Sequence, residues 1–201
     1  AKYHFLAWKE LANSIGIDFT ETQNEKLKGV SRIKSLEKIL EWGNISINHN
    51  EFENLMSKKN EDYLGYIKEM DESEILSDIP KVLEFLQKEQ QGIALGSASK
   101  NARMILEKVN LFNTFDYIVD GNDVINGKPD PEVFLKASEL LEVSAENCIV
   151  FEDSVAGIQA ANNAHMVSIG IGDVKTLHEA DFVFKDFTEI STDFIKDLIE
   201  R

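Results

Sequence analysis

The stretch Cys148–Ala164, CIVFEDSVAGIQAANNA, decides the fold, together with GKPDPEVF at Gly127–Phe134. Its first four residues form a short apolar run that is cut off by polar residues, which predicts a buried strand of a parallel sheet. Glu152 and Asp153 follow directly, and Ser154 is placed to cap the next helix. The two carboxylates are therefore expected at the carboxyl end of a strand, where open α/β sheets bind their ligands.

Two neighbouring acids at a strand tip repel each other unless a cation or a basic group lies near them. Lys128, in the GKPDP loop, is the candidate for that basic group. A second interpretation needs no ligand, because the dipole of an N-capped helix favours acids near its first turn. For Glu152 and Asp153 alone the two interpretations are equally good. The basic loop favours a functional site.

The composition limits the classes of function. The chain has 201 residues, 36 of them acidic and 21 basic, and a formal net charge of −15. This excess argues against nucleic acid and against an anionic membrane surface as partners, because both are negatively charged. The single cysteine, Cys148, lies in an apolar run and allows no disulfide within the chain, which fits a reducing compartment. No apolar run approaches the length of a membrane span.

The periodicity of apolar residues changes once along the chain. Up to about residue 70 it is helical throughout, with helices expected at 4–14, 20–28, 31–43 and 50–70. A short extended piece is expected at 75–79. Strands then alternate with helices, and the strands are expected at 92–96, 117–119, 148–151, 166–170 and 182–184. We predict an α/β fold in which a doubly wound, Rossmann-like parallel sheet forms a core domain of residues 75–201, beneath an all-helical cap domain of residues 1–74.

A doubly wound sheet brings three loops of this chain to one rim. Ser97–Asn101 combines a hydroxyl after a strand with backbone N–H groups at a helix start, which suits phosphate. Gly127–Pro131 presents a lysine, and Glu152–Ser154 presents oxygen ligands of the kind that Mg²⁺ prefers. Each loop alone has a simpler explanation as a helix cap or a surface lysine. Together they indicate a site for phosphate and Mg²⁺.

The motifs in these loops resemble those of the haloacid dehalogenase superfamily of phosphotransferases, and the resemblance covers essentially the whole chain. The segments that carry it are S-A-S-K-N at 97–101, G-K-P-D-P at 127–131 and E-D-S-x-A-G-I-Q-A at 152–160. Three cap segments are more narrowly similar to the phosphosugar mutases of that superfamily: YHFLAWKELA at 3–12, LKGVSR at 27–32 and SKKNEDY at 57–63.

The resemblance implies a role for each matching residue of the core rim. Asp153 is similar to the aspartate that binds Mg²⁺, and Glu152 to the acid beside it that supports the metal shell. Lys128 and Ser97 resemble the pair that holds the transferring phosphoryl group and offsets the charge of its transition state.

The resemblance also implies roles for residues that grip the rest of the substrate. Two phosphate sites would suit a mutase, which must bind a sugar bisphosphate in two orientations. The second, non-reacting phosphate would be held by a set from both domains: Ser99, Lys100, Asn101 and Arg32. In the cap, the loop of Gly29 and Val30 is expected to meet the sugar. His4 and Lys59 are expected to couple cap closure to the position of the acid/base.

In enzymes of that superfamily, an aspartate on the first core strand is phosphorylated. A second aspartate, two residues later, is the general acid/base. Both belong to a D-x-D-G segment expected just before the helix at 3–12, and the sequence contains no such segment. Three explanations stay open: the sequence omits upstream residues, the protein was cleaved, or the protein is a natural relic. A core without its central strand would hold an apolar slot that a stable fold tolerates poorly. We therefore expect the nucleophile to be supplied by upstream residues, either omitted or separately present.

The function implied by the resemblance is the interconversion of β-D-glucose 1-phosphate and glucose 6-phosphate. It would proceed through a phospho-aspartyl enzyme and bound glucose 1,6-bisphosphate, with Mg²⁺ as cofactor. We expect a monomeric, cytoplasmic enzyme whose partner is a small sugar phosphate. Two alternatives stay open: a hexose-phosphate phosphatase of the same superfamily, and a non-catalytic relic that binds sugar phosphate.

Overall fold

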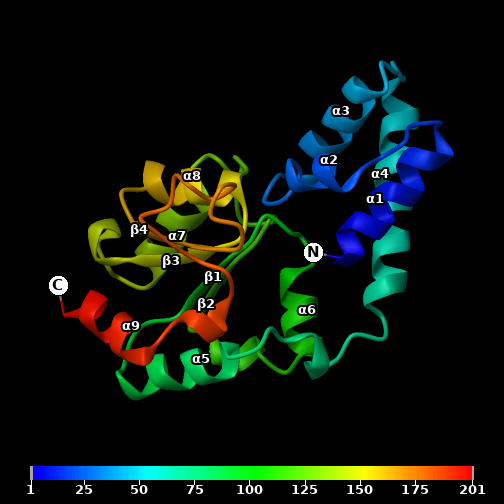
Figure 1. Cartoon of the computed structure of the whole chain (residues 1–201). Helices are drawn as coiled ribbons and strands as arrows, with labels where there is room; N and C mark the ends of the chain where they lie inside the picture. The colour runs from blue at the N-terminus through cyan, green and yellow to red at the C-terminus, as the bar shows by residue number, and fades with distance from the viewer. Residues whose placement is uncertain (1, 201) are drawn as a thin grey trace.

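The computed structural model describes residues 2–200, and its first part is entirely helical. Figure 1 shows these helices, coloured blue to cyan, as one group apart from the strands. They are α1 (Lys2–Ser14), α2 (Glu21–Glu25), α3 (Arg32–Trp42) and α4 (His49–Ile67). None of the helices described between residues 2 and 200 combines the length and the apolar character that crossing a membrane requires.

Local sequence signals set the ends of these helices. The Ser31 side chain caps α3, and Gly43 follows its last residue. A capping box between Asn48 and Glu51 starts α4. The helix expected over 20–28 is shorter, because α2 ends at Glu25 and the chain turns at Gly29, whose φ of +72° favours glycine.

The second part of the chain forms parallel strands flanked by helices, as predicted. The strands are β1 (Ala94–Gly96), β2 (Tyr117–Val119), β3 (Ile149–Glu152), β4 (Val167–Ile171) and β5 (Phe182–Phe184). The α-helices are α5 (Ile79–Lys88), α6 (Ala102–Lys108), α7 (Glu132–Leu140), α8 (Val155–Asn163) and α9 (Thr192–Ile199). Short 3₁₀ helices are η1 (Glu72–Glu74), η2 (Phe112–Thr114), η3 (Ala145–Asn147) and η4 (Phe187–Glu189).

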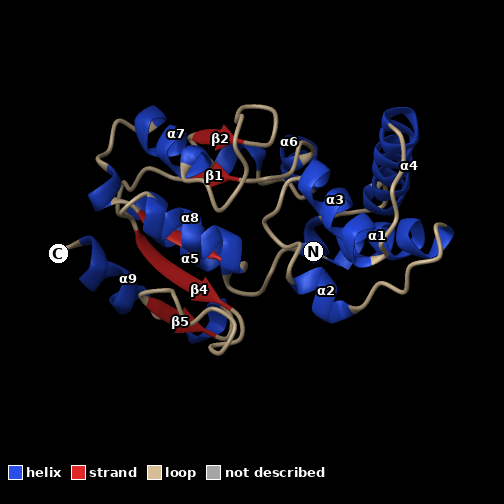
Figure 2. Ribbon diagram, turned by 90° about the horizontal axis from the view of Figure 1, so that it is seen from above, coloured by secondary structure: helices blue, strands red, loops and turns tan. Residues whose placement is uncertain are grey.

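Helices cover both faces of the strands, which is the doubly wound arrangement. On one face, α7 and α8 pack apolar side chains against Val119 of β2 and Val150 of β3. On the other face, α5 and α9 pack against Ile169 of β4 and Phe151 of β3. Figure 2 shows the helical group α1–α4 lying on the side toward which the strands point. This arrangement places the cap beside the carboxyl ends of the strands.

The strands form two sheets instead of the single sheet that was expected. β1 pairs with β2, and β4 pairs with β3 and β5, all in parallel. Within residues 2–200, no strand pairing joins β1 to β3. Between them lies a cavity of about 1090 Å³ lined largely by apolar side chains of β1, β3, α5, α7 and α9. This cavity corresponds to the apolar slot predicted from the sequence.

One expected extended segment is absent from the described residues. Residues 75–79 contain no strand. The chain passes from η1 to Asp78, which has a left-handed φ of +66° and precedes α5, with Pro80 in the first turn of that helix. Proline suits this position because the first helical N–H groups need no intrahelical partner. The domain boundary after residue 74 stays a prediction; η1 ends at Glu74.

Candidate active site

An ion pair between β3 and the loop before α7 forms the centre of the strand-tip rim. Lys128 Nζ lies 2.6 Å from Glu152 Oε2, and the two side chains are only 5% and 9% exposed. The same ammonium donates a hydrogen bond to the Gly96 carbonyl at 3.2 Å, at the end of β1. It also lies 4.5 Å from the centre of the Phe134 ring. The basic group that the sequence placed near the two acids is therefore present.

The other oxygen of Glu152 is held by the start of α8. Oε1 accepts hydrogen bonds from the backbone N–H groups of Asp153 and Ser154, both at 3.1 Å, and from Ser154 Oγ at 2.7 Å. Ser154 Oγ also caps α8 by accepting from the Gly157 N–H. A Cβ at residue 157 would overlap the Glu152 side chain. Glycine at this position therefore allows the Glu152 carboxylate to adopt the conformation described.

The two neighbouring carboxyls have opposite pKa shifts. Burial alone would raise the pKa of Glu152, but the charge of Lys128 and the hydrogen bonds it receives lower that pKa below its ordinary value. Desolvation and the adjacent Glu152 carboxylate raise the pKa of Asp153, and the charge of Lys28 opposes this shift. A cation beside Asp153 would relieve the repulsion between the two acids.

The donor set at this rim fits a Mg²⁺ ion that takes few protein ligands. Glu152 directs both oxygens to protein partners, whereas Asp153 is exposed at the strand tip. Among residues 2–200, no three His, Cys, Asp or Glu side chains gather as a metal site. Mg²⁺ commonly binds through one or two carboxylates and completes its shell with water and phosphate. Asp153 is suited to direct ligation, and Glu152 to support behind it.

The Ser97–Asn101 loop is folded by its own hydroxyl groups. Ser97 Oγ accepts from the Ser99 N–H at 3.1 Å, and Ser99 Oγ accepts from the Asn101 N–H at 3.2 Å. The Ser97 N–H donates to the Val119 carbonyl of β2 at 2.9 Å. Ser97 thus directly follows the β1 residue whose carbonyl binds Lys128. The predicted phosphoryl-holding pair lies on one rim.

A second buried lysine occupies the cap. Lys59 of α4 is 1% exposed, and its Nζ lies 2.7 Å from His4 Nδ1 of α1. The ammonium lies 4.8 Å from the ring centre of Trp8 and 4.7 Å from that of Tyr63, which stacks on His4. Residues 4, 8, 59 and 63 are called the cap cluster below.

The environment of the cap cluster disfavours positive charge. Burial and the nearby Arg32 guanidinium lower the pKa of Lys59 to about 7. Burial and the charge of Lys59 lower the pKa of His4 to about 2, so its imidazole is neutral at pH 7. Burial also lowers the pKa of Arg32, the first residue of α3. The sequence-predicted pair His4 and Lys59 is in direct contact.

The cap touches the core rim at three places. Gly29 lies so close to Ser154 that a Cβ at residue 29 would overlap the serine hydroxyl. Gly127, beside Lys128, lies close to Ser31 of the cap: a Cβ there would be 3.3 Å from the serine Cβ. The Asn101 side chain donates a hydrogen bond to Asn60 Oδ1 at 3.1 Å. The loop of Gly29 and Val30, predicted to meet the sugar, therefore borders the site.

The structure brings most of the predicted residues to this interface, with one difference. Arg32 makes no hydrogen bond to the loop of Ser99, Lys100 and Asn101 within residues 2–200, although Asn60 of the cap does. The sequence analysis did not identify Asn60, or Asp120 after β2. Asp120 is a buried acid directly after a strand, which is the signal that identified Glu152 and Asp153.

Comparison with known proteins identifies the family of the chain. The profile of haloacid dehalogenase-like hydrolases matches residues 2–165. The chain is 38% identical to β-phosphoglucomutase of Bacillus subtilis, covering 100% of this chain and 90% of the relative. It is 32% identical to a phosphorylated carbohydrates phosphatase of Thermotoga maritima, covering 90% and 84%, respectively.

A solved structure shows the same architecture. The crystal structure of β-phosphoglucomutase from Clostridium difficile is similar to this chain with a TM-score of 0.94 and 37% identity. The match covers 99% of this chain and 90% of the other. The family expectation drawn from the loop motifs is therefore confirmed.

Proposed function

The chain belongs to the haloacid dehalogenase-like hydrolase family, and on that premise we propose that it is a phosphosugar mutase. The proposed reaction interconverts β-D-glucose 1-phosphate and glucose 6-phosphate through bound glucose 1,6-bisphosphate. The observation that carries the proposal is the contact of the cap with the rim at Gly29, Gly127 and Asn101. A cap in this position covers the substrate and excludes water, which favours transfer to sugar over hydrolysis.

The core rim would hold the reacting phosphoryl group. Lys128 lies in the loop before α7, and Ser97 directly follows β1, so that an ammonium and a hydroxyl can bind phosphoryl oxygens there. Asp153 would bind Mg²⁺, and Glu152 would fix Lys128 and the start of α8. When bound, Mg²⁺ would neutralise negative charge on the phosphoryl group.

The proposal places the phosphorylated aspartate outside the sequence of residues 1–201. The cavity between β1 and β3 supports this assignment, because each of these strands presents to it an edge that pairs with no strand among residues 2–200. An extended apolar segment in that space would pair with both edges, and its carboxyl end would meet Lys128 and Asp153. We propose that the nucleophile and the acid/base lie on such a segment.

We propose a second phosphate-binding region, which would favour a mutase over a phosphatase. Its residues Lys100 and Asn101 lie in a loop that is hydrogen-bonded to the cap through Asn101. Arg32 is the cap residue proposed to face them, because its planar fork can bind two phosphate oxygens. The similarity to a carbohydrate phosphatase gives the second candidate, a hexose-phosphate phosphatase on the same fold.

The test is ³¹P NMR of the full-length protein with β-glucose 1-phosphate, Mg²⁺ and a trace of glucose 1,6-bisphosphate. A growing glucose 6-phosphate signal supports the mutase and requires that the nucleophile is physically present. Inorganic phosphate as the only product would establish the phosphatase instead. An unchanged spectrum would contradict both activities and favour a binding protein.

Replacement of Arg32 sharpens the distinction. Arg32→Ala is expected to impair the mutase reaction more than hydrolysis of acetyl phosphate, a small donor that has no second phosphate. The exposed Lys34→Ala, in the same first turn of α3, is the matched control for loss of a positive charge. Equal losses of both activities in Arg32→Ala would count against a role at the second phosphate.

A further inference from the structure

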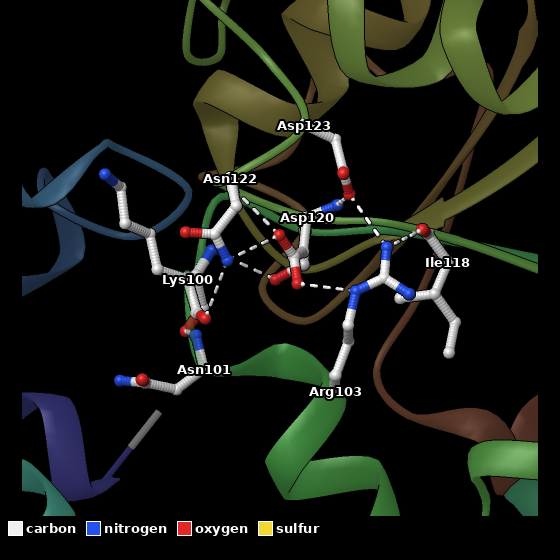
Figure 3. Close-up of polar contacts among 9 residues, drawn as sticks. Lys100, Asn101, Arg103, Ile118, Asp120, Asn122 and Asp123 are labelled. Atoms are coloured by element: carbon white, nitrogen blue, oxygen red, sulfur yellow. Dashed lines mark hydrogen bonds and ion pairs between the residues drawn. The ribbon is translucent and has the colours of Figure 1, made fainter.

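A buried acid after β2 organises a polar network that the proposed reaction does not use directly. Asp120 is 1% exposed, and its Oδ1 accepts from the Asn122 N–H at 2.8 Å and from Asn122 Nδ2 at 3.0 Å. Figure 3 shows this carboxylate at the centre of contacts that come from β2, the following loop and α6. A buried carboxylate is costly unless it is paired and hydrogen-bonded.

Arg103 of α6 supplies the counter-charge and joins three segments. Its Nε lies 3.2 Å from Asp120 Oδ2, and its Nη2 donates to Asp123 Oδ2 at 3.0 Å and to the Ile118 carbonyl at 2.7 Å. Asp123 Oδ2 also accepts from the Asp120 N–H at 2.8 Å. The start of α6 is thereby fixed to the end of β2.

The network continues to the loop that carries Lys100 and Asn101. Asn122 Nδ2 donates to the Lys100 carbonyl at 3.1 Å, and the Gly121 N–H donates to the Ser99 carbonyl at 3.3 Å. The two loops approach so closely that a Cβ at residue 121 would lie 2.5 Å from the Ala98 carbonyl oxygen. The backbone of the Ser97–Asn101 loop is therefore held from its β2 side by hydrogen bonds at two carbonyls.

These contacts use the backbone of Lys100 and leave its ammonium for a ligand. In Figure 3, the Lys100 side chain extends away from the Asp120 network. Asn101 reaches the cap through its hydrogen bond to Asn60. The network thus fixes the backbone from which the Lys100 and Asn101 side chains extend, and it makes no contact with the Lys100 ammonium.

We propose that Asp120, Arg103 and Asn122 are positioning residues for the second, non-reacting phosphate of a sugar bisphosphate. They act through the backbone of Lys100 and Asn101 and do not touch the substrate. The identity of the ligand in this assignment rests on the proposed mutase function. The position of the Ser97–Asn101 loop rests on the Asp120 network alone.

The test removes the link to Lys100 at an exposed position. Asn122→Ala deletes the side-chain donor, and Asn122→Leu keeps a similar shape without the N–H groups and adds no charge. Asn113→Ala is the control, because Asn113 is an exposed asparagine in η2, at the opposite end of β2. Calorimetric titration of each full-length protein would measure the affinity for glucose 1,6-bisphosphate and for inorganic phosphate in the presence of Mg²⁺.

We expect both Asn122 variants to bind the bisphosphate about tenfold more weakly, the scale of one lost hydrogen bond. Affinity for inorganic phosphate should match that of Asn113→Ala. The thermal unfolding midpoint should fall slightly, because Asp120 Oδ1 loses the hydrogen bond from Asn122 Nδ2. A general structural role would weaken the binding of both ligands to the same extent. Unchanged bisphosphate affinity in both Asn122 variants overturns the proposal.

A second readout separates this proposal from the proposed function. Hydrogen exchange of the Lys100 and Asn101 amides should be faster in Asn122→Ala than in Asn113→Ala, with no ligand present. If the wild-type protein shows no preference for bisphosphate over inorganic phosphate, the mutase assignment fails. Amide exchange then still decides whether Asn122 positions the loop, and equal exchange in the two variants overturns that claim.

Discussion

The core rim and the cap each bury one lysine, but they surround it differently. At the core rim, Lys128 faces the Glu152 carboxylate at 2.6 Å and a backbone carbonyl. In the cap cluster, Lys59 faces a neutral imidazole and two aromatic rings. The first lysine has a fixed counter-charge. Lys59 has a hydrogen-bond partner and two aromatic rings around it, and none of these groups carries a negative charge.

The difference shows that burial alone does not decide what a lysine does. A buried ion pair is self-contained, and removing either member leaves the other charge uncompensated. A lysine without a carboxylate has a lowered pKa and can change its charge state near neutral pH. At the core rim, Lys128 is therefore held in its charged state. In the cap cluster, Lys59 can be charged or neutral near pH 7.

The largest effect is expected from breaking the core pair. Lys128→Met should lower the free energy of unfolding by about 3–5 kcal/mol, because Glu152 would remain buried without its counter-charge. Urea denaturation at pH 7 measures this change. The double variant Lys128→Met/Glu152→Gln should recover more than half of the loss. A double variant as unstable as the single one would show that packing against Phe134, and not charge, is responsible.

The cap lysine should make stability depend on pH. Its folded-state pKa of about 7 lies below its ordinary value of 10.5, so the unfolded chain holds the extra proton between these values and stability rises with pH. From pH 6 to pH 9 we expect a gain of about 3 kcal/mol from this residue. Lys59→Met should lose that gain in denaturant titrations across this range.

The neighbouring lysine provides the control for this prediction. Lys58 lies beside Lys59 on α4 but is exposed and paired with Asp62, and the hydrogen bond that Lys58 donates to that carboxylate raises its pKa. Lys58→Met should therefore keep the rise in stability between pH 6 and pH 9. Parallel pH curves for Lys59→Met and the wild-type protein would contradict the assignment.

The contact between the two regions can be tested at Gly29. Gly29→Ala should cost about 1–2 kcal/mol of stability for a left-handed backbone and should also push the cap away from Ser154. Gly16 has a similar φ of +80°, and a Cβ there would meet no atom within 4 Å. Gly16→Ala should show the stability loss alone. Small-angle scattering should detect a larger radius of gyration only in Gly29→Ala.

The smallest effect is expected at the hydrogen bond between cap and core. Asn60→Ala removes the acceptor of the Asn101 side chain and should lower the free energy of unfolding by about 1 kcal/mol. Asn54→Ala, at an exposed position on the same helix, should leave it unchanged. Equal values for the two variants, measured by urea denaturation, would show that this contact does not join the regions.

The sequence predicted the elements that depend on local signals. The strands at 117–119 and 182–184 have the predicted bounds, and Ser154 caps α8. The approach of Lys128 to Glu152 was predictable because parallel strands bring their carboxyl ends to one rim. These features follow from short stretches of sequence and one rule of topology.

Other features depend on tertiary placement and left no clear local signal. The hydrogen bond of Asn60 to Asn101 requires the orientation of the cap, which periodicity does not encode. Asp120 carried a mixed signal: it directly follows a strand, as the two acids of the core rim do, but the glycine and asparagine after it are typical of a surface turn, although its side chain is 1% exposed. The family resemblance gave His4 and Lys59 a shared role, but their contact was not predicted, because the two residues lie on different helices.

The position of the Lys128 ammonium between two strand ends has a mechanical consequence. Ser97 directly follows β1, and Glu152 is the last residue of β3; these two strands do not pair with each other within residues 2–200. Lys128 bonds to the Gly96 carbonyl on one side and to Glu152 on the other. Its ammonium therefore acts as a clamp that sets the spacing of the two halves of the site.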